Sequence, residues 1–404
     1  MKEKLDIAFI GTPDYPIPAI HGGAIQTLVT ALIDKNEENA KFNITIYTIN
    51  DSGLNDIKYK NTDIIGIKLT NLGNLKLIIR KILRRLSKNK ISYRSEYMNK
   101  INKELLQKKY DYVIFETTDK EVVQLDVRVK KFSRIFFHIH ADYINDNTDR
   151  INEISKLVDT FICVSDFINQ RLKTVSALSN SNILTLPNAI EEKNISLTER
   201  KKWREDIRKK YGFSKKDTVF IYCSRLSPEK GCLELEEALL KLNSTSKLLI
   251  VGGTNFSSNK KTKYLQLLKE KSIESNGRIF FTGAVAHEEV VKYMVAADIA
   301  VVPSICNEAC SLTMLEFRAS GLPTIVTNIG GIPEFTNIKA SLFVNYDENF
   351  VWNLTLAMKE LLNDLELRKS LEYNSNKKMD QFYYQEFFNN FVEIIEKDKG
   401  GVKD

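Results

Sequence analysis

The chain has 404 residues, of which 43% are hydrophobic and 27% charged, and its formal net charge is +7. This composition is that of a soluble globular protein and excludes a disordered one, and the length favours two domains. The positive excess fits anionic small molecules, a membrane surface or nucleic acid, and does not choose among them.

Short apolar runs alternate with helical patterns along the chain, which is the signature of a parallel α/β architecture. In the first half, the predicted strands are 6–11, 42–49, 112–116, 135–140 and 160–165. The predicted helices of that half are 23–36 and 152–159. In the second half, the predicted strands are 218–226, 247–253, 278–283, 299–304 and 324–328. The predicted helices between them are 232–242, 287–297 and 312–320.

A polar stretch at 187–201 is the best candidate for a linker between the halves. We therefore expect two doubly wound, Rossmann-like domains, 1–188 and 189–381, with ligands at the carboxyl ends of the strands. The remaining segment, 382–404, is dominated by an amphipathic helix with aromatic residues on one side. No strand follows this helix, so we expect it to cross back onto the first domain.

Cysteine usage and the length of the apolar runs indicate a cytoplasmic protein that does not span a membrane. The five cysteines are scattered and lack paired spacing, which is typical of small buried residues in a reducing compartment. They are Cys163, Cys223, Cys232, Cys306 and Cys310. The N-terminal MKEKLDIAFIG places acidic residues beside an apolar run, which predicts a strand rather than a signal peptide. No stretch approaches about eighteen uncharged apolar residues.

Two carboxylates bracket the stretch EACSLTMLE, at Glu308 and Glu316. The first lies in the loop after a predicted strand, and the second lies a little over one turn inside the next helix, for which Ser311 is a good N-cap. Free backbone N–H groups at a helix start form an anion site, here at Ser311, Leu312 and Thr313. Carboxylates only accept hydrogen bonds, so they suit a ribose diol and a sugar ring on either side of a phosphate. Taken alone, the pair could equally be a capping acid and a solvated helix residue.

Two further stretches favour phosphate binding. In CSRLSPEKG, a strand delivers Arg225 and then Lys230, and two cations at one strand end suit a diphosphate. In HGGAIQT, Gly22 and Gly23 precede a helix and permit close backbone approach to a ligand. The alternatives are a turn with surface bases and a plain loop.

Together these residues resemble the retaining nucleotide-sugar glycosyltransferases of family 4, which have the GT-B fold of two Rossmann-like domains facing each other across a cleft. The resemblance covers nearly the whole chain and is densest over 219–335. The family's Glu-x7-Glu motif matches Glu308 and Glu316, which implies that Glu308 faces the donor sugar hydroxyls and Glu316 the ribose. Arg225 and Lys230 match the pair that holds the donor diphosphate.

The first half adds matches to the same family. Gly22 and Gly23 match its glycine loop, His140 its active-site histidine and Asn188 its domain-junction asparagine. The resemblance implies that His140 positions the donor sugar and stabilises developing charge. Ser224 stands where the family usually has glycine, and Ala309-Cys310-Ser311 replaces a small-aromatic-glycine run. Both departures keep small side chains, so we expect an altered fit of the donor pocket and no loss of activity.

The resemblance implies retaining glycosyl transfer from a nucleotide sugar, with UDP favoured, to a glycan or lipid-linked acceptor in bacterial surface polysaccharide synthesis. It implies no cofactor and no metal. Two alternatives remain open: a non-catalytic subunit that partners another transferase, and a nucleotide-sugar epimerase.

Two further patterns, a pair of histidines on one strand and a basic amphipathic segment, suggest a metal site and a membrane contact. Alternation puts His138 and His140 on one strand face, as in a zinc site, but no acid or cysteine cluster with ligand spacing accompanies them, so no metal site is predicted and His138 is a core residue. The basic amphipathic segment 75–90 predicts either peripheral contact with an anionic membrane or a helix packed on the first sheet. No alternation of bases with stacking aromatics favours nucleic acid.

Overall fold

The computed structural model describes residues 4–70, 95–254 and 262–401. The basic segment 75–90 lies outside the described residues, so its membrane-binding role remains a prediction. No helix within the described ranges is long and apolar enough to cross a membrane.

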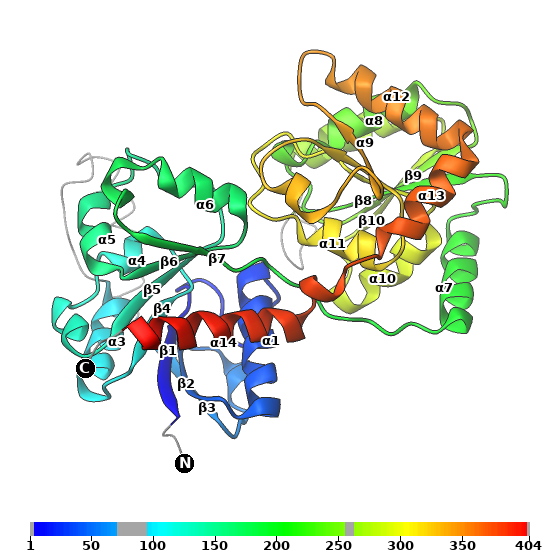
Figure 1. Cartoon of the computed structure of the whole chain (residues 1–404). Helices are drawn as coiled ribbons and strands as arrows, with labels where there is room; N and C mark the ends of the chain where they lie inside the picture. The colour runs from blue at the N-terminus through cyan, green and yellow to red at the C-terminus, as the bar shows by residue number, and fades with distance from the viewer. Residues whose placement is uncertain (1–3, 71–94, 255–261, 402–404) are drawn as a thin grey trace. The chain divides into compact units, whose positions relative to one another are not determined.

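The chain forms two compact units (Figure 1). Unit 1 consists of Met1–Asn188 together with Phe387–Asp404, and unit 2 is Ala189–Glu386. The C-terminal segment therefore belongs to the same unit as the N-terminal half of the chain.

Unit 1 is built on a seven-stranded parallel sheet in the order β3-β2-β1-β4-β5-β6-β7. The strands are β1 (Leu5–Ile10), β2 (Phe42–Ile49), β3 (Thr62–Ile67), β4 (Tyr112–Phe115), β5 (Arg134–Ile139), β6 (Thr160–Cys163) and β7 (Asn182–Thr185). The described helices are α1 (Ala24–Asn39), α3 (Glu96–Gln107), α4 (Asp119–Val122), α5 (Ile151–Leu157) and α6 (Asp166–Lys173). Ala8 and Phe9 are neighbours that point to opposite faces of β1, and both are 0% exposed. Burial on both faces explains why the central strands are continuous apolar runs.

The five strands predicted for the first half are confirmed as β1, β2, β4, β5 and β6. Two strands were not predicted, and both lie at the edges of the sheet. The sequences TDIIGI of β3 and NILT of β7 are only partly buried, so they lack the long apolar run of a central strand.

The C-terminal helix α14 (Tyr384–Gly401) lies across the sheet of unit 1 from Phe387 onward (Figure 1). The ring of Phe391 packs against the rings of Phe9 and Phe42, with centroid separations of 5.9 and 6.0 Å. The aromatic side of the amphipathic pattern is therefore buried against β1 and β2.

Unit 2 is built on a six-stranded parallel sheet in the order β10-β9-β8-β11-β12-β13. The strands are β8 (Thr218–Cys223), β9 (Ser246–Val251), β10 (Ile279–Gly283), β11 (Ile299–Val302), β12 (Thr324–Thr327) and β13 (Ser341–Val344). The described helices are α7 (Leu197–Lys210), α8 (Cys232–Leu240), α9 (Lys263–Ile273), α10 (His287–Ala296), α11 (Leu312–Ala319), α12 (Phe350–Asn363) and α13 (Leu365–Ser375). Phe220 and Ile221 are neighbours on β8, and they belong to two separate buried clusters. The core therefore lies on both faces of this sheet as well.

The predicted strands and helices of the second half are confirmed, and the edge strand β13 is an addition. The predicted linker 187–201 is wrong in its last part, because α7 begins at Leu197. Ser196 and Glu199 form a reciprocal capping box there, a start signal within a stretch interpreted as linker.

Candidate functional site

The strand order of unit 2 reverses between β8 and β11, so the loops after these two strands diverge at their carboxyl ends. In open parallel sheets such a switch point is where ligands bind. Arg225 and Lys230 follow β8, and Glu308 follows β11. The fold thus places two cations at the same edge of the sheet as a carboxylate that lies far from them in sequence.

The carboxylate of Glu308 is held by one of its two oxygens. Lys230 Nζ donates to Oε1 of Glu308 at 2.7 Å, and Ser304 Oγ donates to the same oxygen at 2.5 Å. The side chains of Lys230 and Glu308 are only 16% and 12% exposed. Among the described residues, Oε2 of Glu308 has no hydrogen-bond partner, so it can accept one from a ligand hydroxyl.

Two glycines let the backbone approach closely around this pair. Gly231, which follows Lys230, has φ +69°, and a Cβ there would lie 1.8 Å from the carbonyl oxygen of Pro303. A Cβ on Gly330 would lie 2.5 Å from the carbonyl oxygen of Glu308. A larger residue at Gly231 would push the Lys230 loop away from Pro303, and one at Gly330 would displace the backbone of Glu308.

The start of α11 keeps its backbone donors free of side-chain capping. Ser311 occupies the N-cap position as predicted, but its hydroxyl accepts no hydrogen bond from the first turn, and no acidic residue lies in that turn. The predicted N-cap position is therefore confirmed, although the side chain makes no capping hydrogen bond. The N–H groups at the start of α11, around Leu312 and Thr313, have no side-chain cap to compete with an anion.

Glu316 has a partner that the sequence did not reveal. His287, the first residue of α10, lies with Nε2 2.6 Å from Oε1 of Glu316. This hydrogen bond raises the pKa of His287 above its ordinary value, against the opposing effects of burial and Lys193. As with Glu308, the other carboxylate oxygen of Glu316 has no partner among the described residues.

Arg225 is the more exposed of the two cations. Its side chain is 48% exposed, and its guanidinium lies 3.9 Å from Oε1 of Glu229. So loose a contact leaves the side chain able to turn toward an anion, whereas Lys230 is fixed.

Two cysteines flank Glu308, and neither is fully buried. Cys306 and Cys310 are both partly exposed, as is Cys223, whereas Cys163 and Cys232 are buried. The prediction of buried cysteines therefore holds for two of the five. Burial raises the pKa of Cys306, with the Glu308 carboxylate adding to the shift, so its side chain is a neutral thiol at neutral pH.

In unit 1, the predicted glycine loop precedes α1. Gly22 and Gly23 have φ of +74° and +106°, a region that favours glycine. Gly23 is at the N-cap position of α1, which has no side-chain cap and no acidic residue in its first turn. Next to it, Nε2 of His21 lies 2.9 Å from the Asp51 carboxylate.

His138 and His140 share a buried carboxylate, contrary to the expectation that no acid accompanies them. Glu116 directly follows β4, the neighbour of β5, and its carboxylate lies 3.1 Å from Nδ1 of His138 and 2.6 Å from Nε2 of His140. Burial alone would raise the pKa of Glu116, but the two histidines outweigh it and lower the pKa to about 2. The three side chains offer metal-ligand atoms within 4.8 Å of one another. The absence of a resident metal remains a prediction.

Asn188, the last residue of the first segment of unit 1, is buried, and its Oδ1 has no hydrogen-bond partner among the described residues. An unsatisfied buried amide oxygen is costly, and nothing else in the structure explains it.

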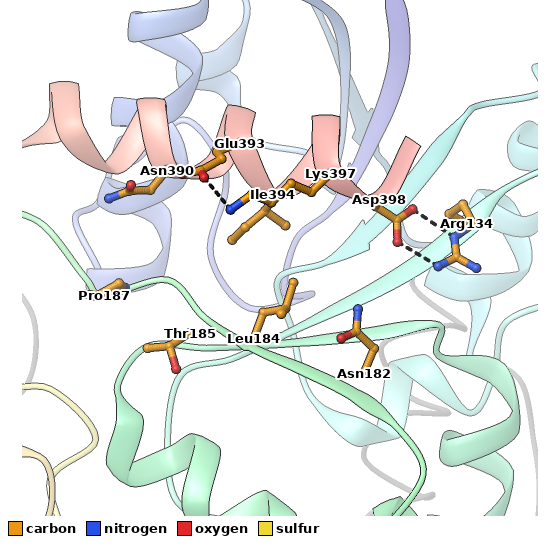
Figure 2. A pocket seen from close by; sticks show the side chains of 10 residues that line it. All are labelled: Arg134, Asn182, Leu184, Thr185, Pro187, Asn390, Glu393, Ile394, Lys397 and Asp398. Carbon is orange, nitrogen blue, oxygen red and sulfur yellow. Dashed lines mark hydrogen bonds and ion pairs between the residues drawn. The ribbon is translucent and has the colours of Figure 1, made fainter. Parts of the chain in front are cut away.

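A cavity of about 620 Å³ lies in unit 1 between α14 and the edge strand β7 (Figure 2). Its charges are internally paired: Arg134 donates to Asp398 at 2.7 Å, and Lys397 pairs with Glu393. None of the predicted site residues lines it.

Comparison with known protein families gives a match within unit 2. Residues 203–378 match the family model described as "Glycosyl transferases group 1". Most of unit 2 is therefore similar to the group 1 glycosyl transferases. The matched residues include Arg225, Lys230, Glu308 and Glu316, whereas His140 lies outside them.

Other known proteins are similar to nearly the whole chain, in sequence or in fold. The chain is 22% identical to spore coat protein SA of Bacillus subtilis (strain 168), over 98% of this chain and 100% of that protein. It superimposes on Anabaena Alr3699/HepE, solved in complex with UDP and glucose, with a TM-score of 0.73, 16% identity, and coverage of 97% and 100%. It superimposes on a glycosyltransferase from Rickettsia africae ESF-5 with a TM-score of 0.75, 17% identity, and coverage of 99% and 100%. The predicted fold class, two Rossmann-like units as in GT-B glycosyltransferases, is confirmed.

Proposed function

We propose that this chain is a retaining glycosyltransferase of family 4. It moves a sugar from a nucleotide-sugar donor, preferably a UDP-sugar, to a glycan or lipid-linked acceptor of bacterial surface polysaccharide synthesis. The reaction needs no metal ion or cofactor.

The observation that carries the proposal is the cluster at the switch point of unit 2. Lys230 is held 2.7 Å from Glu308. The uncapped start of α11 follows in the next few residues of the chain. Cations and helix N–H groups suit a diphosphate, while a carboxylate oxygen left without a partner suits a sugar hydroxyl. A sugar nucleotide presents these groups together, and the solved HepE complex with UDP and glucose belongs to a protein of the same fold.

The proposed roles follow from charge. The bond between the anomeric carbon and the diphosphate oxygen breaks, and its electron pair stays on the diphosphate. Arg225, Lys230 and the start of α11 stabilise that negative charge. The acceptor hydroxyl oxygen bonds to the anomeric carbon on the same face, and its proton passes to the leaving phosphate. Glu308 orients the donor sugar and Glu316 binds the ribose. His140 positions the donor sugar and stabilises developing charge, and the loop at Gly22 and Gly23 allows the backbone to approach the ligand closely.

The first experiment is calorimetric titration of the purified full chain with UDP, GDP and dTDP, followed by incubation with the matching nucleotide sugars. We expect UDP to bind and UDP-sugar to be slowly hydrolysed to UDP and free sugar. NMR of the sugar released at early times should show the anomeric configuration of the donor. Binding without hydrolysis or transfer would favour the non-catalytic subunit, and an altered sugar stereocentre without acceptor would favour the epimerase.

A further inference from the structure

Glu116, His138 and His140 form a buried cluster whose hydrogen-bond directions are determined by chemistry. The side chains of Glu116 and His138 are 3% exposed and that of His140 is 10% exposed. An ionised carboxylate only accepts hydrogen bonds, so both ring nitrogens that face it must carry protons. Nδ1 of His138 and Nε2 of His140 are therefore the N–H donors to Glu116.

This assignment determines what His140 presents elsewhere. A neutral imidazole has one N–H donor and one lone pair, so a proton on Nε2 leaves the lone pair on Nδ1. Burial lowers the pKa of His140 below its ordinary value, and the neighbouring His138 adds to the effect, so the ring is neutral near pH 7. Nδ1 of His140 has no hydrogen-bond partner among the described residues and is not one of the buried, unsatisfied nitrogens. It is thus an accessible acceptor.

His138 differs from His140 in its second nitrogen. Nε2 of His138 is buried and has no partner among the described residues. Among the described residues, the ring is hydrogen-bonded to Glu116 and packs against the ring of His140 at a centroid separation of 4.1 Å, and it is buried from solvent. His138 supports the carboxylate, and His140 is the member of the cluster that can contact a ligand.

The distances favour hydrogen bonds over a metal site. Two ligands of a tetrahedral zinc ion, each about 2.0–2.2 Å from the metal, lie roughly 3.3–3.5 Å apart. Nε2 of His140 and Oε2 of Glu116 are 2.6 Å apart, the length of a charge-assisted hydrogen bond. A metal-bound histidine also usually donates its other N–H to an acceptor, and His138 has none among the described residues.

We propose that Glu116 is a positioning residue: it holds His140 by Nε2–H, so that Nδ1 of His140 accepts a hydrogen bond from a sugar hydroxyl. The role of His140 toward a sugar rests on the proposed function, whereas the orientation of its ring does not. The sequence gives no motif for Glu116, because its link to His140 arises only when β4 and β5 pair.

The orientation can be measured directly, because the chain has only four histidines. Long-range ¹H–¹⁵N spectra of the full chain at pH 8 distinguish the two neutral tautomers, and His138→Asn and His140→Asn assign the signals. We expect the Nδ1–H tautomer for His138 and the Nε2–H tautomer for His140. An Nδ1–H tautomer at His140 would overturn the proposal.

The variant Glu116→Gln then tests the cause. Glutamine keeps one acceptor oxygen and places an NH₂ group, which only donates, where the other oxygen stood, so at least one hydrogen bond from the two rings to residue 116 is lost or reversed and the signals of that ring shift. The signals of His21 and His287 serve as internal controls and should not move. Donor hydrolysis should fall at least about tenfold while UDP affinity stays unchanged, as expected for loss of an orienting carboxylate. Unchanged ring signals at both histidines, or unchanged hydrolysis, would contradict the positioning role.

Two outcomes distinguish this proposal from the proposed function and from a metal site. If the wild-type chain binds no UDP but shows the expected tautomers, the proposed function fails and the orientation by Glu116 stands. If addition of Zn²⁺ shifts the His138 and His140 signals together and the ion remains bound after dialysis, the cluster is a metal site and the proposal is overturned.

Discussion

Replacing the buried Glu236 by methionine should stabilise unit 2 in a pH-dependent way. Glu236 lies on α8, is 0% exposed, and neither carboxylate oxygen has a hydrogen-bond partner among the described residues. Burial raises its pKa from 4.5 to about 8, with Lys271 partly opposing the shift. Glu236 is therefore neutral in the folded protein at pH 7 and ionised in the unfolded chain.

The size of the stabilisation by Glu236→Met follows from the difference in bound protons between the folded and the unfolded state. Between pH 4.5 and pH 8 the folded state holds one proton that the unfolded state has released, so the free energy of unfolding falls as pH rises. The slope is about 1.4 kcal/mol per pH unit. The free energy of unfolding that Glu236 removes adds up to about 3 kcal/mol at pH 7 and about 5 kcal/mol above pH 8. Methionine is unbranched, of similar length and uncharged, so it removes this cost with little change in packing.

Both tryptophans of the chain, Trp203 and Trp352, lie in unit 2, so their fluorescence follows the unfolding of this unit alone. Urea unfolding should be measured for the wild type, Glu236→Met and the control Glu237→Gln between pH 5.5 and pH 8.5. The control removes a charge from the next, partly exposed position of α8. We expect the advantage of Glu236→Met to grow with pH and then level off. An advantage of the same size at every pH would refute the buried neutral carboxyl, because it would mean that Glu236 has the same pKa in both states.

The remaining predictions concern ligands. Glu316→Gln should weaken UDP binding by roughly 1–3 kcal/mol in calorimetry, because the amide is a weaker acceptor for the ribose diol; unchanged affinity would contradict the ribose assignment. Arg225→Ala and Lys230→Ala should each lower donor hydrolysis about 10²-fold or more and leave uridine affinity nearly unchanged, whereas equal losses would indicate misfolding. Protonated His287 competes with ribose for Glu316, so uridine affinity should rise from pH 6 to pH 8 and become flat in His287→Asn; a persisting slope would assign the titration elsewhere. The full chain should bind anionic liposomes through residues 75–90, so it should co-sediment with them at low salt and dissociate from them at high salt. No co-sedimentation at low salt would reject the membrane contact.

The sequence predicted most of the fold because most strands are buried on both faces. The central strands are continuous apolar runs, whereas the edge strands β3, β7 and β13 are short or half-exposed and carry a weaker pattern. The order of the strands is not written in any local pattern, since it depends on which strands pair after folding.

The same limit applies to the candidate sites. Glu308 and Glu316 could be predicted because a strand, a loop and a helix start lie within one short segment. Glu116 and His287 could not, because each gains its role from a residue on another element of its own unit. The N-cap position of Ser311 could be predicted from residue type, but the lack of a capping hydrogen bond could not, because residue type shows only that a hydroxyl can cap a helix.

Helix α14 has a consequence for the order in which the chain folds as it is synthesised. Its Phe391 covers Phe9 and Phe42, yet the ribosome makes it only after the whole of unit 2. Unit 2 is one continuous segment and can complete its core first. Until α14 is made, the aromatic side chains of β1 and β2 that it covers stay exposed. A nascent chain in this state exposes an apolar surface for most of its synthesis, which is the kind of surface that chaperones bind.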